Sequence, residues 1–500
     1  MNTQSPRTPG TPLKFDPTRE SLQQYKCPEW FRDAKFGIWA HWGPQSVPMI
    51  GDWYARNMYL QGNPQNLHHC RVYGHPSKFG YKDLVRLWKA EKFDPENLVD
   101  LYCRAGAKYV YTCGAHHDNF DCWDSKHHAW NSVNVGPGKD IVGLFAEATR
   151  SVGLKFGVTE HLERTWSWFN TNKGSDTYGP FKGVPYDGND PAYQDFYLEK
   201  HGDSSPSYPQ SAPETWMRHW QDRMIDLIKQ YEPDLFYTDG AIPFGKIGLE
   251  VMAEFYNQNL ASKGRLEAVY ALKDHKHLER VGYHGEYREG IGVLDVERGV
   301  VDDIHLNPWQ TDTCIGGWYY KSEIEYKSPG EVISMLVDIV SKNGNLLLNF
   351  PLKPDGTLDD EEIWIAEEIG RWMDVNGEGI YGTRPWHIYG EGPTRLESGL
   401  FAEDKKKKFT ARDIRFTQKG DALYACILGW PDNGRIQIES LRHLNDTRLL
   451  KSVELLGHGP VEYIRRGDEN VYGERGLIIL LPEKKPCSHA WILKIELLPE

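Results

Sequence analysis

The sequence predicts an α/β protein, a TIM-like (β/α)8 barrel followed by a C-terminal all-β sandwich. Short β-rich runs alternate with longer amphipathic stretches from about residue 30 to 380, which is typical of repeated βα units around a parallel sheet. The length of this region allows up to eight strands, which favours a closed barrel over an open sheet. After residues 383–386 the chain changes to short strand-like runs separated by Gly, Pro and Asp, which is typical of a sandwich.

The elements follow from these runs in chain order. The expected barrel strands are 35–42, 108–114, 154–161, 234–240, 265–272 and 345–350. The expected helices are 82–90, 95–106, 143–153, 214–231, 250–264 and 329–344. Between the strand at 265–272 and about residue 328 the chain is expected to be rich in loops. The predicted organisation is an N-terminal extension (1–29), a barrel (30–382) and a β-sandwich (383–500), whose strand-like runs are 422–430, 435–441, 451–458, 476–483 and 489–498.

Composition excludes several classes of protein. Of the 500 residues 39% are hydrophobic and 26% charged, which is ordinary for a globular chain. No apolar run approaches the ~18–20 residues of a membrane span. The net charge of −13 argues against nucleic acid or an anionic membrane as the main partner, because both reward clustered Lys and Arg. The 18 Trp and 27 Tyr suit stacking on sugar rings, although most aromatic rings in any protein belong to the core.

The cysteines and the N-terminus bear on the cellular compartment. The eight cysteines lack the tight spacing of metal ligands, so free thiols in a reduced setting are expected. The first 15 residues are polar and Pro-rich, with no apolar segment of the kind a secretion signal needs. As written, the chain is expected to be cytoplasmic, or secreted or periplasmic if a signal has been removed.

Histidines and carboxylates follow four of the expected strands. His41 ends the first strand, His116 and His117 follow the second, His161 ends the third and Asp239 lies at the end of the fourth. Because barrel strands all end at one rim, these side chains are expected to meet there. Such groups rarely end an apolar strand unless they have a polar partner or a functional role.

The sequence does not fit a metal centre, a serine nucleophile or a phosphate-binding loop. Barrel metal sites usually begin with His-x-His, whereas His41 is followed by Trp and Gly, and adjacent histidines such as His116 and His117 point to opposite faces of a strand. A Gly-x-Ser-x-Gly nucleophile elbow and a Gly-rich phosphate loop are also lacking. No metal and no cofactor is therefore expected.

Paired carboxylates remain, and they suit glycosidic cleavage. That reaction needs one carboxylate to attack or guide water and a second to protonate the leaving oxygen. Asp239 is the best nucleophile, because the apolar run before it would hold it rigidly and partly desolvated. The residues themselves do not rank the candidate acids, which are Asp52, Glu286, Glu289, Asp295, Glu297 and Asp302.

The motifs resemble the α-L-fucosidases of glycoside hydrolase family 29. The resemblance rests on WFRDAKFGIWAHWG (30–43), GDWY (51–54), AKYVYTCGAHHDNFDCWDSK (107–126), LKFGV (154–158), DLFYTDG (234–240), VSKNGNLLLNFPLKPDGTL (340–358) and IYGTRPW (380–386). It implies a barrel followed by a β-sandwich, and a retaining mechanism with Asp239 as the nucleophile. It also implies that His41, His116 and His117 bind fucose hydroxyls.

The resemblance extends to further site residues. Trp53 would line the pocket, Asp52 stands where the family often has Glu, and His161 stands where other members often have Tyr. Many members carry a Trp-Glu pair whose Glu is the acid. Here Trp309, expected in the substrate site, is followed by Gln310, which cannot donate and recover a proton.

The acid/base is therefore expected elsewhere in the same loop region. Glu297 is the first choice, with the neighbouring Arg298 holding its carboxylate, and Glu286 and Glu289 come next. The resemblance thus implies an exo-acting fucosidase on fucosylated glycans. A glycosidase for an α-L-galactoside and a non-catalytic sugar-binding barrel remain alternatives. The insertion 162–215 is expected to form a subsite wall or a subunit contact, and a homo-oligomer is left open.

Overall fold

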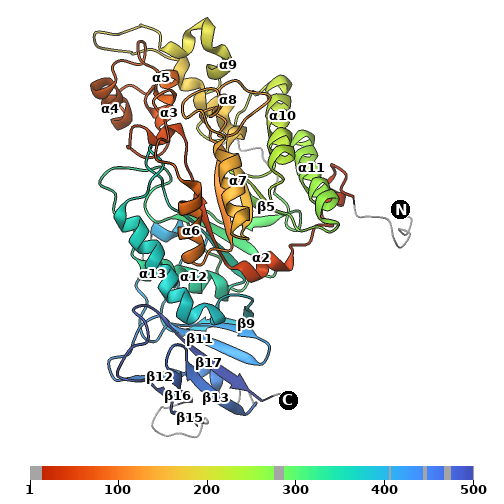
Figure 1. Cartoon of the computed structure of the whole chain (residues 1–500), viewed down its shortest axis with the longest axis vertical. Coiled ribbons are helices and arrows are strands. Elements are labelled where there is room, and N and C mark those ends of the chain that lie inside the picture. The colour runs from red at the N-terminus through yellow and green to blue at the C-terminus, as the bar shows by residue number, and fades with distance from the viewer. Residues whose placement is uncertain (1–13, 275–286, 405–406, 443–447, 467–474, 499–500) are drawn as a thin grey trace.

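The computed structural model describes residues 14–274, 287–404, 407–442, 448–466 and 475–498. Within them a closed eight-stranded parallel barrel is followed by antiparallel sheets. Figure 1 shows the two parts along the long axis, with the antiparallel strands at the end opposite α4 (Pro64–Val72) and α9 (Gln194–Tyr197). The predicted fold class is confirmed.

Eight parallel strands form the barrel in sequence order. They are β1 (Phe36–Ala40), β2 (Tyr109–Ala115), β3 (Lys155–Glu160), β4 (Leu235–Thr238), β5 (Val269–Lys273), β6 (Val293–Asp295), β7 (Trp309–Cys314) and β8 (Gly344–Asn349). Each pairs with the next, and β8 pairs with β1 to close the sheet. Nearly all their residues are buried, as expected for parallel strands covered by helices on the outside.

Two glycines allow large tyrosine rings to fill the barrel. A Cβ atom on Gly37 would lie 2.0 Å from the Tyr109 ring, and one on Gly157 would lie 2.6 Å from the Tyr111 ring. Atoms cannot approach so closely, so a side chain at either position would displace a ring. The interior is therefore packed, as in other barrels of this kind, and the site is left to the rim.

The helices lie outside the barrel and above its rim. They are α1 (Arg19–Leu22), α2 (Glu29–Ala34), α3 (Tyr54–Asn57), α5 (Tyr81–Val85), α6 (Pro95–Arg104), α7 (Ile141–Ser151), α8 (Thr165–Trp168), α10 (Glu214–Tyr231), α11 (Lys246–Lys263), α12 (Pro329–Ser341) and α13 (Asp360–Asn376). α10 covers the predicted range, and α12 begins at a capping box formed by Ser328 and Glu331. Figure 1 shows α3, α4, α5, α8 and α9 gathered at one end of the molecule.

The C-terminal part holds two antiparallel sheets. The larger contains β9 (Arg384–Glu391), β10 (Ile414–Lys419), β11 (Ala422–Ile427), β13 (Leu450–Leu455), β14 (Gly459–Pro460) and β17 (Trp491–Leu497). The smaller contains β12 (Arg435–Ile438), β15 (Tyr463–Arg466) and β16 (Gly476–Leu480). A shared apolar core that includes Phe416, Ile438 and Leu493 joins the two sheets.

Two barrel strands lie where loops were expected. β6 has three residues and pairs with β5 through Val293–Asp295, but with β7 only through Leu294 and Asp295. β7 is rich in polar residues, so its sequence lacks the apolar character of a buried strand. Its polar side chains have partners inside the barrel: Gln310 Nε2 donates to Asp295 Oδ2 at 2.8 Å.

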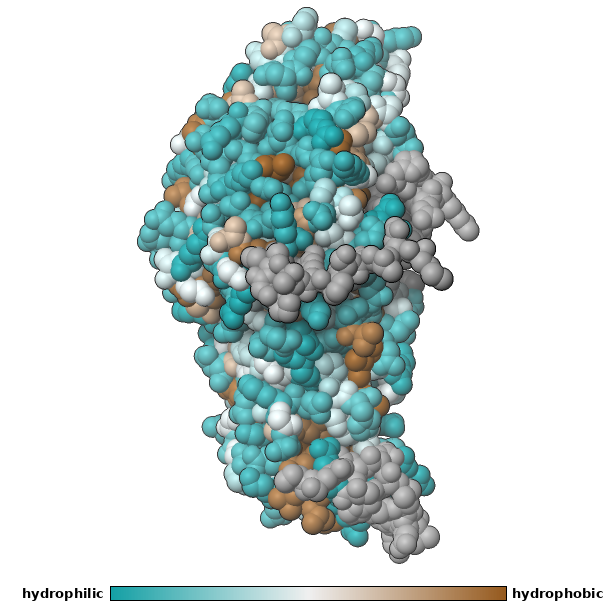
Figure 2. Space-filling view, turned by 90° about the vertical axis from the view of Figure 1, so that its right-hand side faces the viewer, coloured by the Kyte–Doolittle hydropathy of each residue, from teal (hydrophilic) through white to brown (hydrophobic). Residues whose placement is uncertain are grey.

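One face of the molecule is largely polar. Figure 2 shows a face on which hydrophilic residues predominate and hydrophobic ones are scattered. Within the described residues, no helix is both long and apolar enough to span a membrane.

A buried ion-pair cluster joins the barrel to the larger C-terminal sheet. Asp338 on α12 contacts Arg415 Nε on β10 at 2.5 Å and Lys342 Nζ at 2.8 Å, and all three side chains are almost fully buried. We expect Asp338→Asn to lower the free energy of unfolding by about 3–5 kcal/mol, because it leaves two buried cations without an anion. Urea denaturation would measure the loss, and Asp374→Asn on the exposed face of α13 is the control. Equal stability of the two variants would contradict the prediction.

Candidate active site

The ends of four barrel strands bring the predicted histidines to the predicted nucleophile. His41 follows β1, His116 and His117 follow β2, and His161 follows β3. Asp239 comes directly after β4; its Oδ2 lies 3.3 Å from His161 Nδ1 and 3.6 Å from His117 Nε2. The His41 ring packs against those of His161 and His116, with centroids 5.2 and 5.1 Å apart.

Asp239 lies between two cations. Lys273 Nζ is 2.6 Å from its Oδ1, and Arg164 Nη2 is 3.5 Å from its Oδ2. Burial works to raise the pKa of this carboxyl, but the charges of Arg164 and Lys273 outweigh it and hold the pKa well below its usual value. Asp239 is therefore anionic at neutral pH, the state that a carboxylate nucleophile requires.

Glu297 reaches the same lysine from the other side. It lies two residues beyond β6, and its Oε2 is 2.5 Å from Lys273 Nζ. With contacts of 2.6 and 2.5 Å to one nitrogen, Asp239 Oδ1 and Glu297 Oε2 are at most 5.1 Å apart. Burial raises the pKa of Glu297 to about 7, against the opposing charge of Lys273. Asp239 is thus anionic while Glu297 keeps its proton to near neutrality, the states that a nucleophile and a general acid require.

Lys273 is a central residue that the sequence reasoning missed. It ends β5, is 1% exposed, and also lies 3.7 Å from Asp312 Oδ2 on β7. Although burial works to lower its pKa, Asp239, Asp312 and Glu297 hold that pKa well above its usual value. A signal was present, because Lys273 directly follows the strand expected at 265–272. The expected site contained histidines and carboxylates at strand ends but no cation.

Asp52 and Trp53 form a second wall of the site. Asp52 Oδ1 is 3.9 Å from His116 Nε2, and burial raises the pKa of Asp52 to about 7, with further repulsion from Asp239 and Glu297. Trp53 packs edge-on against His117 at 6.4 Å and has a left-handed backbone with φ of 62°. Non-glycine residues adopt this conformation uncommonly.

The insertion 162–215 contributes Trp168. Its ring packs against His117 at 5.1 Å, against Trp53 at 5.7 Å and against His116 at 6.1 Å. The start of the insertion therefore lies beside the predicted sugar-binding residues. Trp168 is fully buried, so it supports these side chains from behind.

Three expectations about geometry need correction. His116 and His117 were expected on opposite faces of a strand, but both approach carboxylates of the site because they lie beyond the last residue of β2. Trp309 was expected in the substrate site, but it begins β7, at the opposite end of the barrel from the rim. It is fully buried, and its Nε1 donates to the Lys342 carbonyl at 2.9 Å. Arg298 was expected to hold Glu297, but its Nε donates to Glu403 at 2.6 Å while Lys273 holds Glu297.

The other candidate acids lie in different surroundings. Glu286 is outside the described residues. Glu289 and Asp302 are exposed, and Glu289 accepts a hydrogen bond from Asn307. Asp295 is buried inside the barrel, where it accepts from Gln310.

Comparisons with known proteins match both parts of the chain. Residues 3–378 match the family model for alpha-L-fucosidase, and residues 406–496 match that for the alpha-L-fucosidase C-terminal domain. The chain is 28% identical to the tissue alpha-L-fucosidase of Homo sapiens, over 98% of this chain and 94% of that protein. It is also 28% identical to the plasma alpha-L-fucosidase of Rattus norvegicus, over 97% of this chain and 95% of that protein.

Solved structures show the same architecture. The structure of Thermotoga maritima alpha-fucosidase in complex with a mechanism-based inhibitor is similar with a TM-score of 0.73 and 26% identity. It covers 97% of this chain and 100% of its own. Because one family model covers most of the barrel and a second covers the sheets that follow, the chain belongs to the alpha-L-fucosidase family.

Proposed function

We propose that the protein is a retaining exo-α-L-fucosidase that removes terminal fucose from fucosylated glycans. The observation that supports a retaining mechanism is that Asp239 Oδ1 and Glu297 Oε2 are at most 5.1 Å apart. Retaining glycosidases have their two carboxyl groups about 5–5.5 Å apart, whereas inverting ones leave about 6.5–9.5 Å for a water molecule.

The two carboxyls then act in turn. Asp239 attacks C1 of the terminal fucose while Glu297 transfers its proton to the departing oxygen, and a covalent fucosyl–enzyme forms. Glu297, now an anion, takes a proton from the attacking water, and the C1–Asp239 bond breaks to release fucose. Lys273 contacts both groups and stabilises whichever of them is anionic.

The residues around the carboxyls supply the sugar contacts in this proposal. His41, His116, His117 and His161 converge on Asp239 with mostly buried rings, and Asp52 and Trp53 complete the wall. Burial lowers the pKa of His41, His116 and His117 well below the usual value, aided by repulsion from neighbouring imidazoles for His41 and His116 and from Arg164 for His117. Neutral imidazoles both donate and accept hydrogen bonds, as sugar hydroxyls require.

Glu297→Gln tests the acid/base role. We expect about 10²–10⁴-fold slower release of fucose from a glycan, with a smaller loss on an aryl fucoside whose leaving group needs no protonation. The wild-type rate should fall as the pH rises through about 7, because Glu297 then loses the proton that it must donate. The variant should lack this alkaline limb. Glu289→Gln, which alters an exposed glutamate of the same segment, is the matched control.

Activity assays also separate the alternatives. Faster hydrolysis of an aryl α-L-galactoside than of the fucoside would redirect the assignment to the related sugar. Binding of fucose without turnover of any fucoside would indicate a sugar-binding barrel. A Glu297→Gln variant that keeps both its rate on glycans and its alkaline limb would remove Glu297 as the acid.

A further inference from the structure

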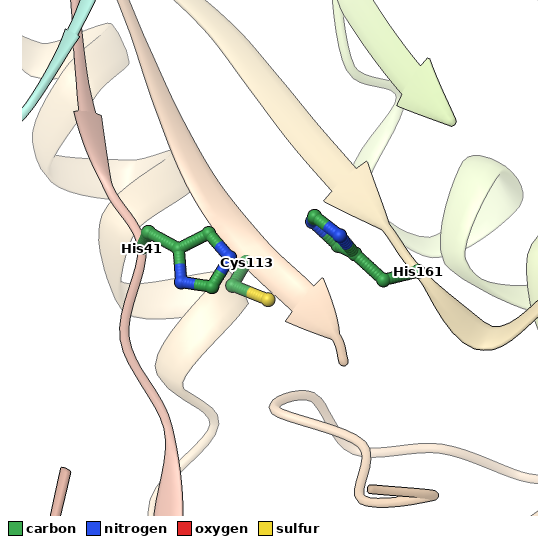
Figure 3. Close-up of side chains that lie close together, drawn as sticks. All are labelled: His41, Cys113 and His161. Carbon is green, nitrogen blue, oxygen red and sulfur yellow. The ribbon is translucent and has the colours of Figure 1, made fainter. Parts of the chain in front are cut away.

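Three side chains from neighbouring strands form a nitrogen–sulfur cluster at the floor of the site. His41 follows β1, Cys113 lies in β2 and His161 follows β3. One potential ligand atom from each lies within 4.8 Å of those from the other two, and the residues are 2%, 1% and 3% exposed. Figure 3 shows the two rings and the thiol close together. We call this set the His2Cys cluster.

The cluster contains buried nitrogens without hydrogen bonds. Within the described residues, His41 Nδ1 and His161 Nε2 are both buried and lack a hydrogen-bond partner. A buried polar atom left unpaired costs about 1–3 kcal/mol, so two in one place call for an explanation. The other nitrogen of His161, Nδ1, already faces Asp239, which leaves Nε2 for a ligand.

Two other groups of side chains near Asp239 are less suited to a metal ion. One consists of His116, His117 and His161, and the other of His117, Glu163 and Asp239. His116 Nδ1 is bonded to Gln45 and His117 Nδ1 to the His161 carbonyl. Glu163 and Asp239 both face the guanidinium of Arg164, whose positive charge opposes a cation.

We propose that the His2Cys cluster binds a thiophilic divalent cation such as Zn²⁺ or Cd²⁺. Two imidazoles and a thiolate are ligands that such ions prefer, and a tetrahedral ion at about 2.0–2.3 Å from each ligand would leave one position for water. Around Zn²⁺ the ligand atoms need to lie about 3.3–3.6 Å apart. They now lie within 4.8 Å of one another, so small side-chain rotations would bring them to these distances.

Atoms and charge balance in this step. The cluster offers an imidazole nitrogen from each histidine and the thiol of Cys113, and a thiol must lose its proton to become a metal ligand. Binding forms the metal–sulfur bond and releases the thiol proton to the solvent, while no group is oxidised or reduced.

Metal and sugar exclude each other at this site. This consequence rests on the proposed function, in which His41 and His161 bind the fucose hydroxyls. Their nitrogens cannot hold a hydroxyl and a metal ion at the same time. The cation is therefore expected to act as a competitive inhibitor, and it has no part in catalysis.

Titration with Cd²⁺ tests the cluster without any turnover. We expect one equivalent to produce the ultraviolet band of cadmium–thiolate charge transfer and to release one proton in the wild-type protein. The band should be absent from Cys113→Ala and present in Cys122→Ala, which removes another buried thiol close to the cluster. L-Fucose should suppress it. A wild-type protein without the band, or a Cys113→Ala variant that keeps it, would overturn the proposal.

Inhibition assays give the second readout. Cys113→Ala should turn over an aryl fucoside at the wild-type rate. Its inhibition constant for Cd²⁺ should rise at least about 10-fold, because loss of a residue that only supports a metal ligand already costs about that much affinity. Unchanged inhibition would contradict the site. If the Cd²⁺ band forms but fucose does not suppress it, the metal site stands and the placement of fucose on these histidines fails. If Cys113→Ala does not fold, Cys113→Ser replaces it, because a hydroxyl fills nearly the same space and gives no cadmium–thiolate band.

Discussion

Asp239→Gly is expected to lower the turnover of an aryl α-L-fucoside by about 10⁴–10⁶-fold, the scale of loss when a covalent nucleophile is removed. The remaining groups can bind fucose and protonate the leaving oxygen, but none can form the bond to C1. Added azide should enter the space left by the carboxylate and restore turnover, with β-fucosyl azide as the product. Activity with and without azide, and the anomer formed, are the measurements.

The controls separate chemistry from folding. Removing Asp239 leaves Lys273 and Arg164 with one anion fewer, so circular dichroism must show that the variant is folded. Asp239→Asn keeps the shape of the side chain and should lose activity to a similar extent. Asp302→Asn, in an exposed loop, should behave as wild type. Near-normal turnover by both Asp239 variants would remove this residue as the nucleophile.

Lys273→Met is expected to lower kcat by about 10²–10³-fold, comparable to the loss of one preorganised electrostatic group. The pH profile should move as well. Lys273 stabilises the anionic forms of Asp239 and Glu297, so removing it raises both pKa values. Both limbs of the bell-shaped profile should therefore shift to higher pH, and Lys273→Arg should shift them less.

The matched control lies at the other end of the barrel. Lys155 also contacts two carboxylates, Asp234 at 3.2 Å and Glu267 at 3.4 Å, but at the start of β3. Lys155→Met should leave the pH profile unchanged. If Lys273→Met slows the reaction while both limbs stay in place, Lys273 has only a structural role.

Residues at the ends of recognisable strand runs could be predicted from the sequence. Leu235–Tyr237 before Asp239 is an apolar run, the run before His161 has the composition of a strand, and the barrel rule then brings the ends of both to one rim. The structure describes these residues in contact, together with His41, His116 and His117. Their roles in binding and chemistry remain predictions until the variants are measured.

Other parts of the site depend on packing that the sequence does not reveal. β7 is buried although its side chains are polar, because Gln310 donates to Asp295 and Asp312 accepts from Tyr237 inside the barrel. Hydrophobic patterns cannot predict such a strand. Because β7 could not be recognised as a strand, the sequence also did not show that Trp309 begins that strand and lies away from the rim.

The shortness of β6 has a consequence for how the enzyme would fail under heat. Glu297 is held just beyond a three-residue strand that meets β7 through only two residues, whereas Asp239 follows a four-residue strand that meets β3 through four residues and β5 through three. Segments with few backbone hydrogen bonds open at lower free energy than the fold as a whole. A warmed enzyme should therefore lose proton donation before nucleophilic attack, and glycan cleavage should decline at temperatures where activated aryl fucosides are still hydrolysed.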